Sequence, residues 1–324
     1  MLVVVAGALL LYASDHSDAP HIGTFSRQDA NITDLHAFVV GVSPNQHLVV
    51  ALSTNPAIPP SATSYVFPTD VTFEVNIDAH SAVDAADPFG DGGTVADPRA
   101  VREDTTFRIG FREDGSAKVQ RLEHGGRNDD PGLVSFFTGL RDDPFIRKPR
   151  DGRNSASIVL EMPLSSVARK QSTILLWATS EVDDFEGPYQ DAVGRSLRSM
   201  FAENDALNST RPKDHVKKLG VRPDVMIFDT SKPALYPNGR ALTDDVVLRA
   251  CVLSQECRVF NSEMRPPTPR ANDVTFLATF PYLAPHTLLR DAAHGASGVR
   301  SADRAGRWHA GHARPGDAPH PRPT

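Results

Sequence analysis

The chain has 324 residues, of which 40% are hydrophobic and 23% charged, and its formal net charge is −6. This is the composition of an ordinary globular protein, and the mild acidity excludes the basic footprint of a nucleic-acid-binding domain. Residues 15–286 are numerous enough to bury the core of one large domain.

The chain begins with an unbroken apolar run from Leu2 to Tyr12. A run of this length spans about 16 Å as a helix, which is too short for a bilayer core of about 30 Å. Its position favours the apolar region of a signal peptide, with a cleavage site at Ala13-Ser14. We therefore predict that residues 1–14 are a signal peptide and that the protein is exported, to the periplasm, the cell surface or the medium. The alternative is a buried N-terminal strand.

Short alternating or continuous apolar runs predict strands over the first two thirds of the chain. Residues 35–40 and 47–53 flank a turn at Pro44-Asn45 and predict a hairpin. Residues 71–77 alternate cleanly between apolar and polar side chains, which predicts a half-buried strand. The other predicted strands are 105–111, 118–122, 157–162 and 173–179, with a short helix at 163–168.

Helical patterns gather in the last third of the chain. Apolar spacing predicts a helix over residues 189–207, and Thr243 is the expected N-cap of a second helix over 244–253. Residues 274–280 are expected to form a last strand or an extended buried segment. Strands followed by helices are typical of antiparallel sheets rather than of alternating βαβ units. We predict a mainly β fold, an antiparallel β-sandwich-like body with a few peripheral helices in the C-terminal third.

The end of the chain differs from the predicted single β-rich domain of residues 15–286. Residues 287–324 are rich in Arg, His, Gly and Pro and lack a hydrophobic period, which predicts a disordered tail.

The two cysteines, Cys251 and Cys257, do not have the C-x-x-C spacing of a zinc or redox motif. In an oxidising compartment they can form a disulfide, and the alternative is two buried thiols.

Several short segments, taken together and in chain order, resemble an uncharacterised bacterial family, domain of unknown function family 4331. Its members open with S-S-H-R-E-A-P after a signal peptide, and continue with motifs close to A-D-N-T-D-L-Y-A-F-V and R-D-D-P-F-F. The matching segments here are Ser14–Pro20, Asp29–Val39, Arg141–Ile146, Asn238–Val246 and Asn272–Pro285.

The resemblance covers about Ser14 to His286 and implies an exported, β-rich body without an assigned activity. Two positions depart from the family pattern. His36 stands where the family usually has tyrosine, and His286 stands where a second proline usually follows Ala284-Pro285.

The most frequent chemical feature of the sequence is an aspartate beside small polar residues. Calcium takes six to eight oxygen ligands, which Asp-rich loops at strand ends supply. We therefore predict Asp29, Asp34 and Asp78 as ligands of a structural calcium ion. The alternative is that these side chains cap turns and strands by bonding to backbone N–H groups.

Histidines near the N-terminus suggest a second chemistry. His16 is a candidate metal ligand, and the alternative is that it docks the N-terminal segment onto the core. If His16, His36 and His47 converge, they would form an open zinc site of the catalytic type. The sequence contains neither the G-x-S-x-G nucleophile motif nor a glycine-rich phosphate loop.

These observations predict an exported, non-catalytic binding or surface protein with a structural calcium site and no nucleic-acid partner. One alternative is a secreted metal-assisted hydrolase. Another is a subunit of a larger cell-envelope assembly, in which the loops contact a protein partner.

Overall fold

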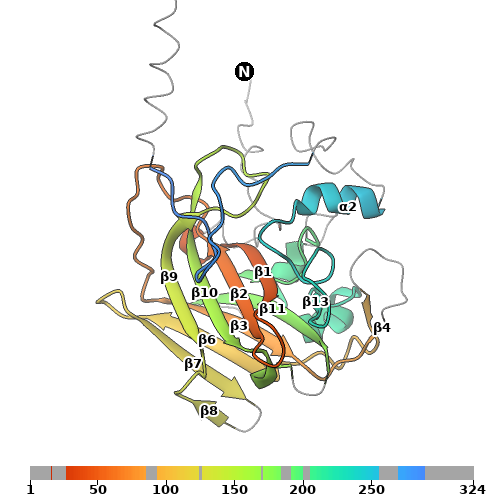
Figure 1. Cartoon of the computed structure of the whole chain (residues 1–324). Coiled ribbons are helices and arrows are strands. Elements are labelled where there is room, and N and C mark those ends of the chain that lie inside the picture. Colours follow the sequence, from red (N-terminus) through yellow and green to blue (C-terminus); the bar gives the residue numbers. More distant parts are fainter. Residues whose placement is uncertain are drawn as a thin grey trace, which may run out of the picture. The chain divides into compact units, whose positions relative to one another are not determined.

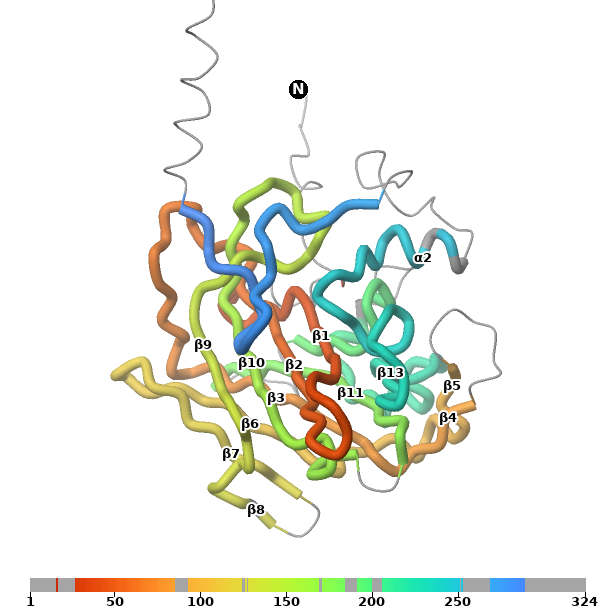
Figure 2. The backbone as a smooth tube through the Cα atoms, viewed as in Figure 1, coloured from red at the N-terminus to blue at the C-terminus, as the bar shows by residue number. Residues whose placement is uncertain are grey.

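The computed structural model describes His16 and residues 27–84, 93–123, 126–168, 171–183, 191–199, 205–254 and 269–288 (Figures 1 and 2). The chain divides into two units, Met1–Leu288 and Leu289–Thr324, and every described residue belongs to the first. Residues 1–14, Cys257 and the predicted tail beyond Leu288 lie outside the described residues, so the leader, the disulfide and the disorder of the tail stay predictions.

Four antiparallel strands form the first sheet, in the order β1-β2-β10-β9. The β1–β2 hairpin confirms the predicted pairing of residues 35–40 with 47–53. The strands are β1 (Ile32–Val40), β2 (His47–Thr54), β9 (Ser135–Asp142) and β10 (Asn154–Pro163).

The second sheet is also antiparallel and has the order β12-β11-β3-β6-β7-β8, with β13 pairing β11. Its strands are β3 (Val71–Asp78), β6 (Thr105–Phe111), β7 (Ala117–Glu123), β8 (Gly126–Asn128), β11 (Thr173–Val182), β12 (Asp191–Val193) and β13 (Met226–Asp229). Two short strands, β4 (Val83–Asp84) and β5 (Thr94–Val95), pair beside it.

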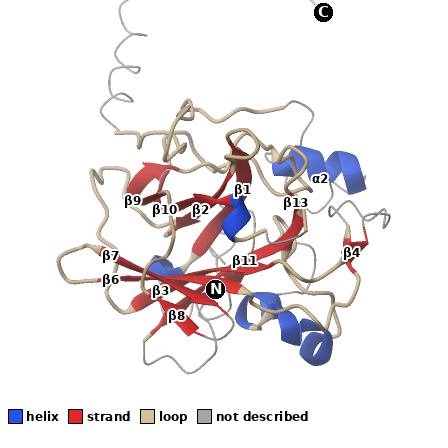
Figure 3. Cartoon of the chain, turned by 60° about the horizontal axis from the view of Figure 1, so that its bottom comes forward, coloured by secondary structure: helices blue, strands red, loops and turns tan. Residues whose placement is uncertain are grey.

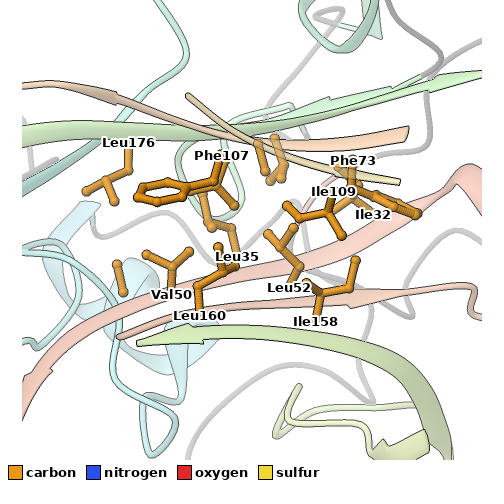
Figure 4. Close-up of a cluster of buried hydrophobic side chains, with 14 of the residues drawn as sticks. Ile32, Leu35, Val50, Leu52, Phe73, Phe107, Ile109, Ile158, Leu160 and Leu176 are labelled. Carbon is orange, nitrogen blue, oxygen red and sulfur yellow. The ribbon is translucent and has the colours of Figure 1, made fainter. Parts of the chain in front are cut away.

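The two sheets lie face to face as two layers (Figure 3). Alternation along β3 turns Val71, Phe73, Val75 and Ile77 into the space between them, and all four are fully buried. Figure 4 shows side chains of both sheets pointing toward one another. The predicted mainly β, antiparallel, sandwich-like fold is therefore confirmed.

Helical elements are short and lie at the edges of the sandwich. The helix predicted over residues 244–253 is confirmed as α2 (Val246–Ser254). Its N-cap is Asp245 rather than Thr243, because the backbone N–H of Leu248 donates to Asp245 Oδ1 at 3.2 Å. The other turns are η1 (Gln28–Ala30), η2 (Leu164–Ser166), η3 (Asp205–Ser209), η4 (Pro212–Asp214) and η5 (His215–Leu219). Among the described residues, none of the helices combines the length and apolarity needed to cross a membrane.

The helix predicted over residues 189–207 is wrong over the described residues 191–199, and only residues 205–207 are helical, in the short η3. Asp191–Val193 form β12, which pairs with β11, and Leu197 has a left-handed φ of 66°. The Asp191 carboxylate accepts the backbone N–H of Ile32 at 2.9 Å, which ties this segment to β1. Long-range pairing has therefore overridden a local helical pattern.

Neither form expected for residues 274–280 is correct. The described residues 269–288 contain no strand, and residues 274–280 are partly or fully exposed rather than buried. This segment (blue in Figure 2) packs Phe276, Phe280 and Leu283 against the outer face of the first sheet. Its backbone turns back on itself instead, because Leu277 N–H donates to Tyr282 O at 2.8 Å.

A buried lysine fastens this C-terminal segment to the sandwich. Lys148 Nζ donates to Asp142 Oδ2 at 2.8 Å and to Asn272 Oδ1 at 3.0 Å, and it also pairs with Asp273. Burial raises the pKa of the Asp142 carboxyl to about 6, an effect that the attraction of Lys148 only partly offsets.

This raised pKa predicts a pH-dependent contribution to stability. Folded Asp142 holds its proton above the pKa of the unfolded chain, so its contribution is complete below about pH 4 and is lost as the pH rises through about 6. We expect Asp142→Asn to gain stability relative to the wild type between about pH 4 and about pH 7. Urea unfolding at both pH values measures this difference, and a difference that does not change with pH would contradict it.

Candidate functional site

The outer face of the second sheet carries a row of buried polar side chains on β3. Glu74, Asn76 and Asp78 alternate with the core residues and point away from them. These three residues are 6%, 1% and 0% exposed. The sequence predicted only a half-buried strand, whereas the structure covers this face as well.

Asp78 ends β3 and its carboxylate organises the turn that follows. Oδ1 accepts the backbone N–H groups of His80 and Ser81, both at 2.9 Å. Oδ2 accepts the Ser81 hydroxyl at 2.6 Å and the backbone N–H of Arg102 at 3.1 Å. One buried carboxylate therefore joins the turn after β3 to the segment that leads into β6.

Asp104 completes this arrangement from the other side. Its Oδ2 accepts the backbone N–H of Ala79 at 2.8 Å and lies 2.5 Å from Nδ1 of His80. A carboxylate buried among N–H donors acts as an acceptor, so Nδ1 of His80 carries the proton. In the neutral imidazole, Nε2 then keeps its lone pair. Asp104 is 3% exposed and His80 is 43% exposed, so the ring extends from a buried anchor toward solvent.

His80 lines a pocket of about 570 Å³ on this face. Three cationic residues, Arg99, Arg102 and Lys213, also line the pocket. The acid among the described lining residues is Asp214. Its carboxylate pairs with Lys218 at 3.0 Å. The pocket therefore has a positive balance of charge around a histidine whose orientation is fixed.

The metal ligands predicted from the sequence do not come together, and each makes its own contacts. Asp29 forms a bidentate ion pair with Arg27, at 2.8 and 3.1 Å. Asp34 is buried and accepts from Arg240 at 2.8 Å. Within the described residues, the group that has metal-ligand spacing is Asp78, His80 and Asp104, so Asp29, Asp34 and His16 do not join Asp78.

His16 lies in the core. It is 1% exposed, its Nε2 lies 3.2 Å from Asp191 Oδ2, and its Nδ1 lies 3.3 Å from Thr33 O. These contacts match the docking alternative, in which the residue joins the N-terminal segment to β1 and β12.

The predicted zinc site of three histidines is wrong in its geometry. The register pairs His47 with Val40, four residues along β1 from His36. The two histidines are therefore separated by about 13 Å along the sheet, whereas a shared zinc ion requires both nitrogens at about 2 Å. His47 instead pairs with Glu161, at 2.7 Å from Nδ1 to Oε1.

His80 and Asp104 were missed by sequence reasoning. Asp78 was singled out because it ends a strand, but its partners lie in a loop and at the start of another strand. Residues 78 and 104 meet only because β3 pairs with β6. The available signal is a pair of polar residues, His80 and Ser81, shortly after a strand, together with an acid directly before a later strand. This pattern is common in turns.

The first prediction from this site concerns Asp78. Asp78→Ala leaves four donors without their acceptor in a buried turn, which we expect to lower the free energy of unfolding by about 2–4 kcal/mol. Asp97→Ala is the matched control, since within the described residues the Asp97 carboxylate accepts a single N–H, that of Arg99, at an exposed position. Urea denaturation measures both, and equal losses in the two variants would refute the role of Asp78.

The second prediction concerns His36, which is buried and has no hydrogen-bond partner on either ring nitrogen among the described residues. Burial, and secondarily the charge of Arg240, hold the pKa of His36 well below 6.5. The unfolded chain therefore binds a proton that the folded chain does not, and stability is lost as the pH falls below about 6.5.

We expect His36→Phe to reduce this acid sensitivity, because phenylalanine fills similar space without a titrating group. Thermal melting at about pH 7.5 and about pH 5 measures the change. His47→Gln serves as the control because His47 is partly exposed. A loss of stability on acidification as large in His36→Phe as in the wild type would contradict the assignment.

Comparison with known proteins found no matching family model, no similar curated protein and no matching solved structure. The resemblance to domain of unknown function family 4331 therefore stays a prediction, and the site is interpreted from its own chemistry.

Proposed function

We propose that this chain is an exported binding protein whose ligand is a small anion held in the pocket beside His80. The observation that carries this proposal is the convergence of Arg99, Arg102 and Lys213 on one pocket with an oriented histidine. Hydrogen bonds from cationic donors to anions are about twice as strong as those between neutral groups. The apolar run Leu2–Tyr12 supports export.

The charges of the pocket are available to a ligand. Within the described residues, neither Arg99 nor Lys213 has an ion-pair partner. Arg102 lies 3.8 Å from Asp104 Oδ1, a long contact, with a side chain that is 55% exposed. A pocket of about 570 Å³ is within the range of small-molecule sites. These cations therefore favour a small ligand that brings negative charge.

A bound cation is the second candidate, favoured by the ligand atoms of Asp78, His80 and Asp104, which lie within 4.8 Å of one another. An imidazole nitrogen suits zinc better than calcium, which takes oxygen ligands. Both carboxylates, however, already accept backbone N–H groups. An ion would have to replace the contact between His80 and Asp104, so the anion is the better supported ligand.

Calorimetric titration of the protein with inorganic phosphate and with citrate tests the proposal. We expect Arg102→Gln to weaken the binding of whichever of these two anions binds by about 1.5 kcal/mol, which is about tenfold in Kd. Arg112→Gln is the control, because Arg112 is exposed and contacts Ser116 outside the pocket.

Two outcomes would count against the anion. One is the absence of binding by either anion at low ionic strength. The other is stoichiometric zinc that is lost in Asp104→Asn, which would establish the cation and revive the metal-assisted hydrolase.

A further inference from the structure

His80 contributes a nucleophilic nitrogen to the basic pocket, and within the described residues its Nε2 makes no hydrogen bond. Its Nδ1–H donates to Asp104, so the lone pair of the neutral ring is on Nε2, the nitrogen that faces away from this anchor. The backbone holds the ring in place as well, because His80 N–H donates to Asp78 and Gln171 Nε2 donates to His80 O at 2.9 Å. The ring is therefore oriented from both its side chain and its main chain.

The other lining groups with nucleophilic atoms are engaged. The Ser81 hydroxyl donates to Asp78 Oδ2 at 2.6 Å, and the Asp214 carboxylate pairs with Lys218. Lys213 is solvent-exposed, and its ammonium group has no lone pair to offer. Among the described pocket residues, His80 Nε2 is therefore the nucleophilic atom whose lone pair is not used in another contact.

We propose that His80 accepts a phosphoryl group on Nε2 from a small acyl phosphate, which makes the protein a phosphohistidine-forming phosphatase. This inference rests on the proposed anion pocket and names its substrate class. Arg99, Arg102 and Lys213 supply the positive charge that the phosphate oxygens require during transfer.

The step balances without a further reactant. The Nε2 lone pair forms a bond to phosphorus, and the bond from phosphorus to the acyl oxygen breaks, so the carboxylate leaves with the electron pair. Because a carboxylate needs no proton to leave, an acyl phosphate suits a pocket without a dedicated general acid. Water then attacks phosphorus, the electron pair of the N–P bond returns to Nε2, and phosphate and a proton are released.

Asp104 is a positioning residue in this scheme. Phosphorylation of Nε2 gives the ring a positive charge, and the carboxylate on Nδ1 offsets that charge at hydrogen-bond distance. Glu161 makes the same contact with His47, where His47 is 29% exposed. His47 does not line the basic pocket, so this second pair is a control for the chemistry of a histidine bonded to a carboxylate.

Incubation of the full chain with acetyl phosphate, followed by mass spectrometry of the intact protein and its peptides, tests the proposal. We expect up to about one phosphoryl group per chain on His80 during turnover, stable to alkali and labile to acid once the protein is denatured, together with release of inorganic phosphate. His80→Gln should lose the label and His47→Gln should keep it. Asp104→Asn should slow labelling about tenfold while its Kd for inorganic phosphate stays within about twofold.

The outcomes separate this inference from the proposed function. Phosphate binding without a label on His80 overturns the phosphohistidine and leaves the anion pocket standing. The absence of both phosphate binding and label overturns both. Equal labelling of His80→Gln and the wild type, or a label that alkali removes, shows a different acceptor and overturns the inference.

Discussion

The site depends on two carboxylates that are buried where β3 gives way to a loop. Asp78 accepts four donors and Asp104 accepts two, and together they join the turn after β3 to the segment before β6. Because the pairing of β3 with β6 brings both acids together, the sheet anchors the turn that carries His80. A histidine on such a turn keeps one orientation, which is the condition for selective contact with a ligand.

Buried charge also joins the outer segments to the first sheet. Arg240 pairs with Asp34, and Arg147 forms a bidentate pair with Asp245, the residue that caps α2. Such pairs contribute little net stability, but the loss of one partner leaves a buried charge uncompensated and costs several kcal/mol. These ion pairs favour one placement of the outer segments on the sheet over others. Apolar packing alone would specify that placement less sharply.

The strands of the sandwich could be predicted because their apolar residues alternate and because turn residues separate them. The helix over residues 189–207 could not be rejected, since the interaction that makes Asp191–Val193 a strand comes from β11 and β1. The candidate site was only partly predicted. Asp78 was singled out, but a polar residue on an outward face reads as solvated in the sequence, and the contacts with His80 and Asp104 depend on strand pairing. Asp29 and Asp34 have an acidic pattern like that of Asp78, yet each pairs with an arginine.

The contacts that hold β1 also bear on the timing of folding. Ile32 and His16 bond to Asp191 across 159 and 175 residues, and Asp34 bonds to Arg240 across 206 residues. A chain dominated by such non-local closures has a high contact order and folds slowly. The first strand cannot complete its polar contacts until most of the polypeptide has been synthesised. A nascent chain that ends before Asp191 therefore holds β1 without these contacts of Ile32 and Asp34.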